Sequence, residues 1–288
     1  MASGKAVILG GEGQLGRALA ASVPPGWKAI TLGRPELDIT NPAAVDSILK
    51  LELPTIVLNA AAYTAVDRCE SEEEIAHAVN ATAVGVLARV ASARGAQFVH
   101  VSTDFVFDGT AGRPYAPDSA TAPLGAYGRT KLAGERAAGA DALIVRTAWV
   151  YAPTGSNFVR TMLKLMRERP EVYVVADQIG TPTYAPDLAS AIWALAMQGA
   201  RGIHHYTDSG VASWYDFAVA IQEEARTLGL LDKSVPIIPI ATVDYPTPAA
   251  RPSYSVLDKT ATYAALGGPA SHWRTNLRIM LHKVCQNG

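Results

Sequence analysis

Short runs of apolar and β-branched residues alternate with longer segments of helical periodicity from Lys5 to about Arg169. Because short buried runs predict strands and apolar residues spaced three and four apart predict helices, this part consists of repeated β–α units. The predicted strands are 5–9, 28–32, 55–59, 97–102, 142–147 and 172–175, and the predicted helices are 14–22, 42–51, 72–94, 125–138 and 157–169. The alternation predicts an α/β fold with a doubly wound parallel sheet.

The strict alternation weakens beyond about Ala176. Helices are predicted at 187–197, 213–228 and 271–284, and short strands at 202–206 and 235–240. The proline-rich stretch 243–252 is a long loop, which is as consistent with ligand contact as with plain connection. We therefore expect a cofactor-binding domain at 1–176 that carries the catalytic residues, and a smaller α/β lobe at 177–288 that mainly binds substrate. Some segments of the cofactor-binding domain and of the substrate-binding lobe are expected to interleave.

The composition is that of an ordinary globular protein, with 288 residues of which 49% are hydrophobic and 18% charged. The formal net charge of −1 provides no field for a polyanion, so we expect no nucleic-acid partner. Two cysteines, Cys69 and Cys285, form no disulfide framework or zinc motif and fit a reducing cytoplasm. No run of 18 apolar residues occurs, so we expect neither a membrane span nor export.

Three glycines, Gly10, Gly13 and Gly16, directly follow the first predicted strand and open the first predicted helix. Glycine allows the tight turn there and lets backbone N–H groups approach a pyrophosphate, whose charge the helix N-terminus favours. Their spacing, G-x-x-G-x-x-G, differs from the usual G-x-G-x-x-G, so the motif depends on its strand–turn–helix context. It predicts a dinucleotide site in a Rossmann-type fold; the alternative is a purely structural turn.

The second predicted strand ends at Gly33-Arg34, where an NAD site commonly has an acid. Arg34 can pair with a 2′-phosphate, which favours NADPH over NADH; the alternative is a solvated surface arginine. Other candidate cofactor contacts follow the second and third strands, and for the alanines helix packing is the alternative: Asp38, Ile39, Ala60, Ala61 and Ala62.

Thr103 ends the fourth predicted strand, and Tyr127 and Lys131 lie four residues apart in a later predicted helix. Residues i and i+4 share a helix face, so the ammonium should lie near the phenol and lower its pKa, as acid–base catalysis requires. Thr103, at the carboxyl end of a parallel strand, could hydrogen-bond a substrate carbonyl oxygen. A lone Y-x-x-x-K is usually surface decoration, but after a glycine turn and a strand-ending Ser-Thr it predicts a catalytic group.

Tyr127, Lys131 and the three glycines resemble the extended short-chain dehydrogenase/reductase superfamily. Within it, motifs spread over nearly the whole chain resemble the dTDP-4-dehydrorhamnose reductase family. They are Asn59-Ala60-Ala61-Ala62-Tyr63-Thr64, Ser102-Thr103-Asp104-Phe105, Tyr127-Gly128-Arg129-Thr130-Lys131, Arg146-Thr147-Ala148-Trp149, Asp177-Gln178-Ile179-Gly180-Thr181-Pro182-Thr183 and Arg251-Pro252.

The resemblance implies reduction of the C4 ketone of a dTDP-linked 4-keto sugar with NADPH, or NADH, as hydride donor. It implies that Tyr127 donates the proton, that Lys131 holds the nicotinamide ribose and that Thr103 polarises the ketone. It places Gly13, Gln14 and Leu15 at the pyrophosphate, and Ala62, Tyr63 and Thr64 further along the cofactor; Gly16 belongs to the same cofactor-binding turn. The implied substrate contacts are Thr103, Asp104, Trp149, Asn157, Gln178 and Arg251.

Some positions depart from the family pattern. Phe105 stands where some members have Tyr, so one hydroxyl contact to substrate is missing. Ala18 and Pro186 stand where certain members have glutamates for a dimer-bridging magnesium, so we expect no metal and a cytoplasmic monomer or weak homodimer. Two alternatives remain: a nucleotide-sugar epimerase or dehydratase of the same superfamily, and a non-catalytic subunit resembling the regulatory subunit of methionine adenosyltransferase. The intact Thr103, Tyr127 and Lys131 argue against the second.

Overall fold

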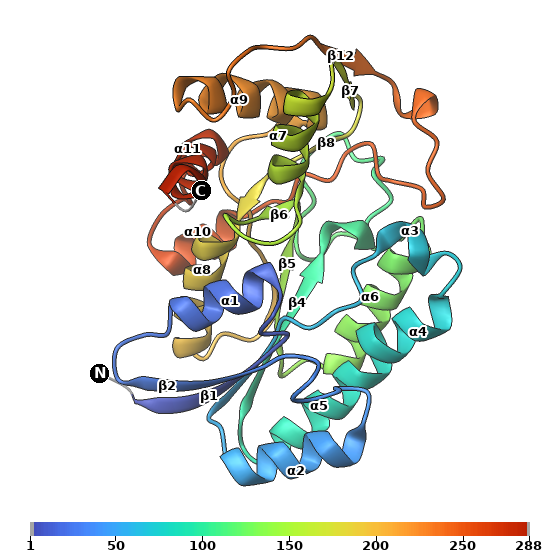
Figure 1. The fold of residues 1–288 in the computed structure, drawn as a ribbon. Helices are drawn as coiled ribbons and strands as arrows, with labels where there is room; N and C mark the ends of the chain where they lie inside the picture. The colour runs from blue at the N-terminus through green and yellow to red at the C-terminus, as the bar shows by residue number, and fades with distance from the viewer. Residues whose placement is uncertain (1–2, 287–288) are drawn as a thin grey trace.

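The computed structural model describes residues 3–286, and its centre is a parallel sheet of six strands (Figure 1). In spatial order the strands are β10 (Gly202–His205), β5 (Leu143–Thr147), β4 (Gln97–Thr103), β3 (Ile56–Asn59), β1 (Gly4–Leu9) and β2 (Trp27–Leu32). Every neighbouring pair is parallel. The chain order reverses between β1 and β3, and this switch point is where sheets of this kind bind ligands.

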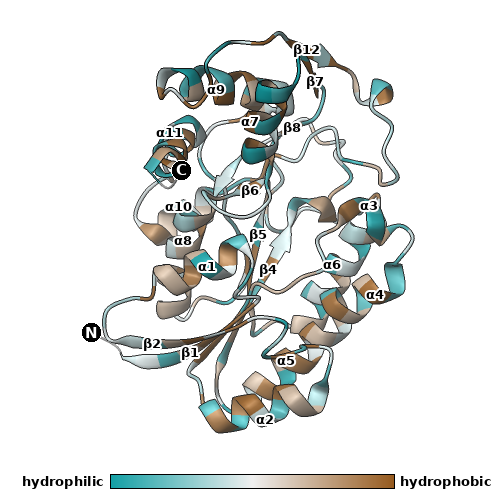
Figure 2. Ribbon diagram, in the orientation of Figure 1, coloured by the Kyte–Doolittle hydropathy of each residue, from teal (hydrophilic) through white to brown (hydrophobic). Residues whose placement is uncertain are grey.

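Both faces of the sheet are covered by helices, as the alternation predicts. Side chains of a strand alternate between faces, so Val7 and Leu9 pack into one cluster while Ala6 and Ile8 pack into another. The first face is covered by α2 (Pro42–Glu52), α5 (Ala83–Ser92) and α6 (Ala126–Ala138), and the second by α1 (Gln14–Ala21) and α8 (Ala185–Met197). Figure 2 shows hydrophobic and hydrophilic residues on different sides of α2 and α5.

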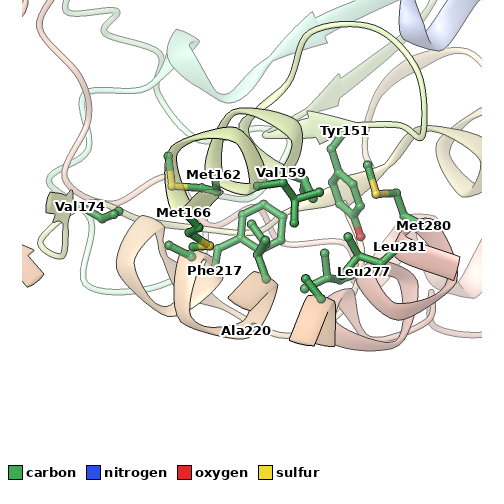
Figure 3. Close-up of a cluster of buried hydrophobic side chains, with 14 of the residues drawn as sticks. Tyr151, Val159, Met162, Met166, Val174, Phe217, Ala220, Leu277, Met280 and Leu281 are labelled. Carbon is green, nitrogen blue, oxygen red and sulfur yellow. The ribbon is translucent and has the colours of Figure 1, made fainter. Parts of the chain in front are cut away.

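A third hydrophobic cluster forms an upper lobe (Figure 3). Its helices are α7 (Phe158–Glu168), α9 (Trp214–Thr227) and α11 (Trp273–Gln286), with the parallel strands β7 (Val172–Val175) and β12 (Ile237–Ile240). Smaller pairs are β6 (Val150–Tyr151) with β9 (Thr183–Tyr184) and β8 (Ile179–Gly180) with β11 (Ala212–Ser213). The remaining short elements are α3 (Val66–Cys69), η2 (Asp104–Val106), η3 (Thr242–Asp244) and α10 (Thr260–Leu266).

The chain passes between the two lobes more than once. Helix α7 lies before residue 176 but packs in the upper lobe, whereas α8 and β10 lie after it and pack on the sheet. The division at 176 therefore stays a prediction about where cofactor and substrate bind, and packing does not follow it.

Two predicted elements differ in detail from the structure. Strand 172–175 forms, but it pairs with β12 outside the main sheet, which a local pattern cannot specify. The predicted helix 72–94 is divided into α4 (Glu73–His77), a π-helical turn η1 (Ala78–Thr82) and α5. In that turn the buried Asn80 amide bonds the backbone of Tyr63, with its Oδ1 accepting from Tyr63 N at 2.8 Å. The widened turn thus ties this helix to the segment after β3.

The run Glu73–Ser92 is long and apolar enough to cross a membrane by length and composition. More than half of its apolar window, 56%, is buried inside the fold, and the run packs against α2, α6 and β4. In this fold the run forms the helical elements α4, η1 and α5, which pack against the sheet layer.

A buried ion pair ties α6 to β5. Arg146 donates to Glu135 through Nε and Nη2, at 2.9 and 2.7 Å, and both side chains are at most 4% exposed. Ser102 on β4 adds a hydroxyl donor to the same carboxylate. Such a pair contributes little over an apolar replacement of both partners, but removing one partner leaves a buried charge uncompensated.

We predict that Arg146→Met lowers the free energy of unfolding by about 3–5 kcal/mol. The matched control is Arg201→Met, which breaks the 2.6 Å pair with Asp141 whose side chains are 67% and 89% exposed. That change should cost at most about 1 kcal/mol. Urea unfolding of both variants measures the difference, and equal losses would contradict the assignment of Glu135–Arg146 as a buried constraint.

Candidate active site

The strands β1, β3 and β4 all end at the same edge of the sheet, and the predicted cofactor residues gather there. Gly10 follows β1 and Ala60 follows β3, so they flank the switch point. A cavity of about 260 Å³ opens between them. The predicted cofactor residues that line this cavity are Gly10, Gly13, Arg34, Asp38, Ile39, Ala60, Ala61, Ala62 and Tyr63.

Each glycine of the turn has a different role. Gly10 has φ +78°, and a Cβ there would lie 2.6 Å from the backbone nitrogen of Ala61, so the approach of β1 to β3 requires glycine. A Cβ on Gly16 would overlap the Gly10 carbonyl, so helix–strand packing requires glycine there. A Cβ on Gly13 would meet only the Gly10 carbonyl, at 3.2 Å, and would otherwise occupy open space at the cavity.

The start of α1 also fits an anionic ligand. Gly13 is its N-cap residue and supplies no side-chain acceptor to the first N–H groups of the helix. These donors and the helix dipole favour a phosphate at the opening that Gly13 leaves. The turn therefore fits the pyrophosphate of a dinucleotide.

The end of β2 holds more negative charge than the local sequence indicates. Arg34 is exposed and lines the cavity, as predicted. Glu36 folds back so that its carboxylate accepts from Gly33 N at 2.8 Å, and the Glu12 side chain also reaches Gly33. The sequence predicts no acid at this strand end, because Gly33-Arg34 contains none. That prediction is wrong in the folded chain, since a turn places the Glu36 carboxylate next to Gly33. The pairing of Arg34 with a 2′-phosphate stays a prediction, and these carboxylates would weaken it.

Besides Gly16, Tyr127 and Lys131, three predicted cofactor residues lie outside the cavity lining. The Leu15 side chain is buried in the sheet core, and Thr64 is exposed. Gln14 bridges to the upper lobe: its Oε1 accepts from Asn157 Nδ2 at 2.8 Å and its Nε2 donates to Ser156 O at 3.3 Å. Their cofactor contacts stay predictions.

The predicted catalytic side chains Thr103 and Tyr127 meet where β4 ends and α6 begins. The Thr103 hydroxyl donates to Asp104 Oδ1 at 3.0 Å, and it also lowers the pKa of Tyr127. Burial nevertheless raises the pKa of Tyr127 above its usual value, since desolvation outweighs this contact. The Phe105 ring lies edge-on to Tyr127 with centroids 5.6 Å apart. The phenol therefore stays protonated near neutral pH.

Asp104 is buried beside this pair, 2% exposed. Burial raises the pKa of its carboxyl to about 6, while the nearby hydroxyls of Ser255 and Thr103 act to lower it. Its Oδ2 accepts no hydrogen bond of normal geometry from residues 3–286. A buried carboxylate oxygen without a donor is costly unless a ligand supplies one. The structure thus leaves an acceptor at the predicted substrate position.

Lys131 does not lie where the spacing predicts. Its Nζ donates to Val101 O at 2.6 Å and lies 3.2 Å from His100 Nε2, both on β4. Burial raises the pKa of Tyr127, and Lys131 is not among the groups that shift it, so the expected lowering by the ammonium is wrong. The i, i+4 spacing fixes the shared helix face, but the long side chain is held by the strand beneath.

A second cavity, of about 300 Å³, lies in the upper lobe. Two predicted substrate residues, Gln178 and Arg251, line it together with aromatic side chains that the sequence analysis did not single out: Phe158, Tyr173, Trp214 and Tyr245. Gln178 donates through Nε2 to Thr242 at 3.1 Å. The cavity combines aromatic faces with a cation, which suits a nucleotide.

Arg251 is held by an acid from the other lobe. Its guanidinium forms two bonds to the Asp67 carboxylate, at 3.1 and 2.9 Å, and also donates to Ala249 O and Thr247. This pair lowers the pKa of Asp67. An anion reaching Arg251 would share or replace the Asp67 contact.

Two further predicted substrate residues make structural contacts. Trp149 has φ +49° and stacks on Trp214, with centroids 3.5 Å apart and planes 9° from parallel. Asn157 is the N-cap of α7: its Oδ1 accepts from Arg160 N, and its Nδ2 donates to Gln14 and Ala152. Their substrate contacts stay predictions. Within residues 3–286 no three His, Cys, Asp or Glu side chains are grouped to hold a metal, and the expected absence of a metal likewise stays a prediction.

The sequence analysis missed one polar residue next to the catalytic group, His100. It is fully buried on β4 and contacts Lys131 and Asn59. His100 could have been found from the sequence, because it stands in the middle of an apolar strand run. A histidine in such a run is expected to be buried and therefore to have hydrogen-bond partners.

Comparisons with known proteins agree along almost the whole chain. The family model "RmlD substrate binding domain" matches residues 4–286. A dTDP-4-dehydrorhamnose reductase from Burkholderia thailandensis is 43% identical over 284 residues, covering 94% of this chain and 95% of the relative. The crystal structure of dTDP-4-dehydrorhamnose reductase from Bacillus anthracis, in complex with NADP, is 34% identical with a TM-score of 0.92, covering 98% of this chain and 100% of that chain.

A more distant neighbour is the UDP-glucose 4-epimerase of Thermus thermophilus in complex with NAD. It is 18% identical with a TM-score of 0.82, covering 97% of this chain and 98% of that chain. At that identity the likeness concerns the fold alone.

The two glycines Gly13 and Gly16 should separate binding from folding. We predict that Gly13→Ala keeps the wild-type melting temperature but weakens NADPH binding at least about tenfold, because its Cβ fills the phosphate opening. Gly16→Ala should instead lower the free energy of unfolding by about 1–3 kcal/mol, because its Cβ overlaps the Gly10 carbonyl. Thermal unfolding and NADPH fluorescence titration measure both. Unweakened binding by Gly13→Ala would remove the turn from the cofactor site.

Proposed function

The chain belongs to the RmlD substrate-binding-domain family, and we propose that it reduces the C4 ketone of dTDP-4-dehydro-L-rhamnose to dTDP-L-rhamnose with NADPH. One observation carries the proposal: Thr103, close enough to Tyr127 to lower its pKa, ends β4 at the same edge of the sheet as the glycine-lined cavity that follows β1 and β3. The matched reductases, which extend along nearly the full chain, support the same reaction.

The cofactor, when bound, supplies a hydride to the carbonyl carbon. The Gly13–Leu15 amides would hold its pyrophosphate, and Arg34 its 2′-phosphate. Ala60–Ala62 leave room beside Gly10 for the chain of the dinucleotide.

The proton that completes the alcohol comes from Tyr127. As the ketone oxygen becomes an alkoxide, the phenol donates its proton to that oxygen, and its raised pKa ensures that the proton is present beforehand. Thr103, turned from Asp104 to the same oxygen, donates a second hydrogen bond that stabilises the developing charge. Asp104 Oδ2, which has no partner among the described side chains, accepts from a sugar hydroxyl.

The nucleotide end of the substrate would occupy the upper cavity. There Arg251 can bind the diphosphate bidentately, exchanging its contact with Asp67. Trp214 and Phe158, which line the cavity, offer flat faces to the base, and Trp149 supports Trp214 by stacking on it.

The alternatives receive less support. A dehydratase usually adds an acidic pair after the threonine, whereas Thr103 is followed by one acid, Asp104, and then Phe105. A non-catalytic subunit would not need Thr103 and Tyr127 in contact at the cavity. We also propose that the enzyme acts in the cytoplasm as a monomer or weak homodimer, without a metal or a nucleic-acid partner.

The reductase proposal is tested with dTDP-6-deoxy-L-lyxo-4-hexulose made in situ, following the absorbance of NADPH. We predict substrate-dependent oxidation by the wild type, and a loss of kcat of about 10²–10⁴ in Tyr127→Phe with NADPH affinity unchanged. Tyr263→Phe is the matched control: it removes a half-buried hydroxyl bonded to Thr207 O, in a different part of the fold. No oxidation above the blank would reject the proposal, and full activity of Tyr127→Phe would reject its proton donor.

Cofactor choice depends on Arg34. We predict that Arg34→Ala raises the Kd of NADPH about tenfold and that of NADH less than about twofold, because only NADPH has the 2′-phosphate. Arg136→Ala, an exposed arginine outside the cavity lining, serves as the control. Equal changes for the two cofactors would show that Arg34 is an ordinary surface residue.

A further inference from the structure

A chain of buried polar contacts runs from the backbone after β3 to Lys131. Ala61 N donates to Asn59 Oδ1 at 3.1 Å, and Asn59 Nδ2 lies 3.1 Å from His100 Nδ1. His100 Nε2 lies 3.2 Å from Lys131 Nζ, which also donates to Val101 O. Asn59, His100 and Lys131 are each at most 2% exposed, so water does not compete for these contacts.

The Ala61 amide determines the direction of every bond in this chain. A backbone N–H can only donate, so Asn59 must turn its oxygen to Ala61 and its NH₂ group to His100. His100 Nδ1 is then the acceptor. Burial holds the pKa of His100 well below its usual value, so the ring is neutral and carries one proton, which must be on Nε2.

The Nε2–H of His100 therefore faces Lys131 Nζ. An ammonium has no lone pair and cannot accept this proton, whereas a neutral amine can accept it and still donate to Val101 O. We infer that His100, its tautomer set by Asn59 and the Ala61 amide, is a positioning residue that holds Lys131 on β4 as a neutral amine at alkaline pH until cofactor binds. Protonation breaks the contact with His100 and frees the side chain for the cofactor.

The charges around Lys131 agree with this assignment. Burial lowers the pKa of Lys131 to about 8, although Glu135, one turn further along α6, acts to raise it. Glu135 is itself paired with Arg146, and Glu73 on α4 is paired with Arg129. The other titratable groups at this face are Tyr127 on α6 and Asp104 on η2. Tyr127 stays neutral at working pH, and the hydroxyl of Thr103 donates to the Asp104 carboxylate.

The inference deepens the proposed function, because it assumes that Lys131 holds the nicotinamide ribose as an ammonium. Cofactor binding above the pKa of free Lys131 must then take up a proton from solvent. The proton moves from the acid form of the buffer to the lone pair of Lys131 Nζ, which leaves the conjugate base of the buffer in solution, and no other covalent bond of the protein changes.

Two measurements on the wild type test the inference without any ketone substrate. Two-bond ¹H–¹⁵N correlation spectra should show His100 as the Nε2–H tautomer, with its signals assigned by their absence in His100→Gln. Calorimetric titration of NADPH in buffers of different ionisation enthalpy, at about pH 9, should show uptake of nearly one proton per cofactor. An Nδ1–H tautomer or no proton uptake would overturn the inference.

Variants then test the role of the tautomer. In Asn59→Asp the carboxylate accepts from both Ala61 N and His100 Nδ1, so Nε2 becomes an acceptor that suits an ammonium. The pKa of Lys131 should rise by at least about one unit, and proton uptake at about pH 9 should fall to half or less. Asn59→Ala, which frees the ring without adding charge, and His100→Gln, whose amide oxygen can accept from the ammonium, should act in the same direction.

His205→Gln is the matched control. His205 is also a buried strand histidine beside a cation, 3.4 Å from Arg146 Nη1, but it does not contact Lys131. It should leave proton uptake unchanged. Asn59→Ala and His100→Gln could instead bind NADPH more weakly at every pH and leave proton uptake unchanged. That result would show a purely structural role and overturn the inference. If proton uptake is found but no ketone is reduced, the proposed reaction fails and the inference stands.

Discussion

The close approach of two backbones at the switch point is the constraint on which the site depends. Gly10 and Ala61 come so near each other that a Cβ on Gly10 would lie 2.6 Å from the Ala61 nitrogen. This approach turns the chain into α1 with its first amides uncapped, and opens the cavity beside them. It also fixes the Ala61 amide, whose single N–H orders the Asn59–His100–Lys131 chain.

Helix α6 is held against β4 by side chains spaced along one of its faces. Tyr127, Lys131 and Glu135 lie four residues apart on one face, and each meets a different part of the strand or its end. Tyr127 lies near enough to Thr103 for its pKa to be lowered. Lys131 contacts His100 and Val101. The Glu135 carboxylate accepts hydrogen bonds from Ser102 and from Arg146 on β5. The proposed proton donor, the proposed cofactor ligand and the structural ion pair thus share one interface.

Local patterns were sufficient for the strands of the sheet and for the positions of Gly10, Gly13, Thr103 and Tyr127 in the fold, because strand ends, glycine turns and helix starts are local signals. Contacts that depend on packing were not accessible. Glu36 returns to Gly33 through a turn, and Lys131 bends away from Tyr127 because β4 offers it a carbonyl and an imidazole. The partners of Arg251 and Trp149, namely Asp67 and Trp214, come from distant parts of the sequence.

The repeated passage of the chain between its two lobes limits how such a protein can diversify. Helix α8 and strand β10 complete the sheet layer, whereas α7, α9 and α11 build the lobe above it. No single cut therefore separates the two as independently folding units, and a new upper lobe cannot be acquired by recombination at one junction. Specificity for a different sugar nucleotide must instead arise by substitution within the existing cavity wall, while the sheet beneath stays intact.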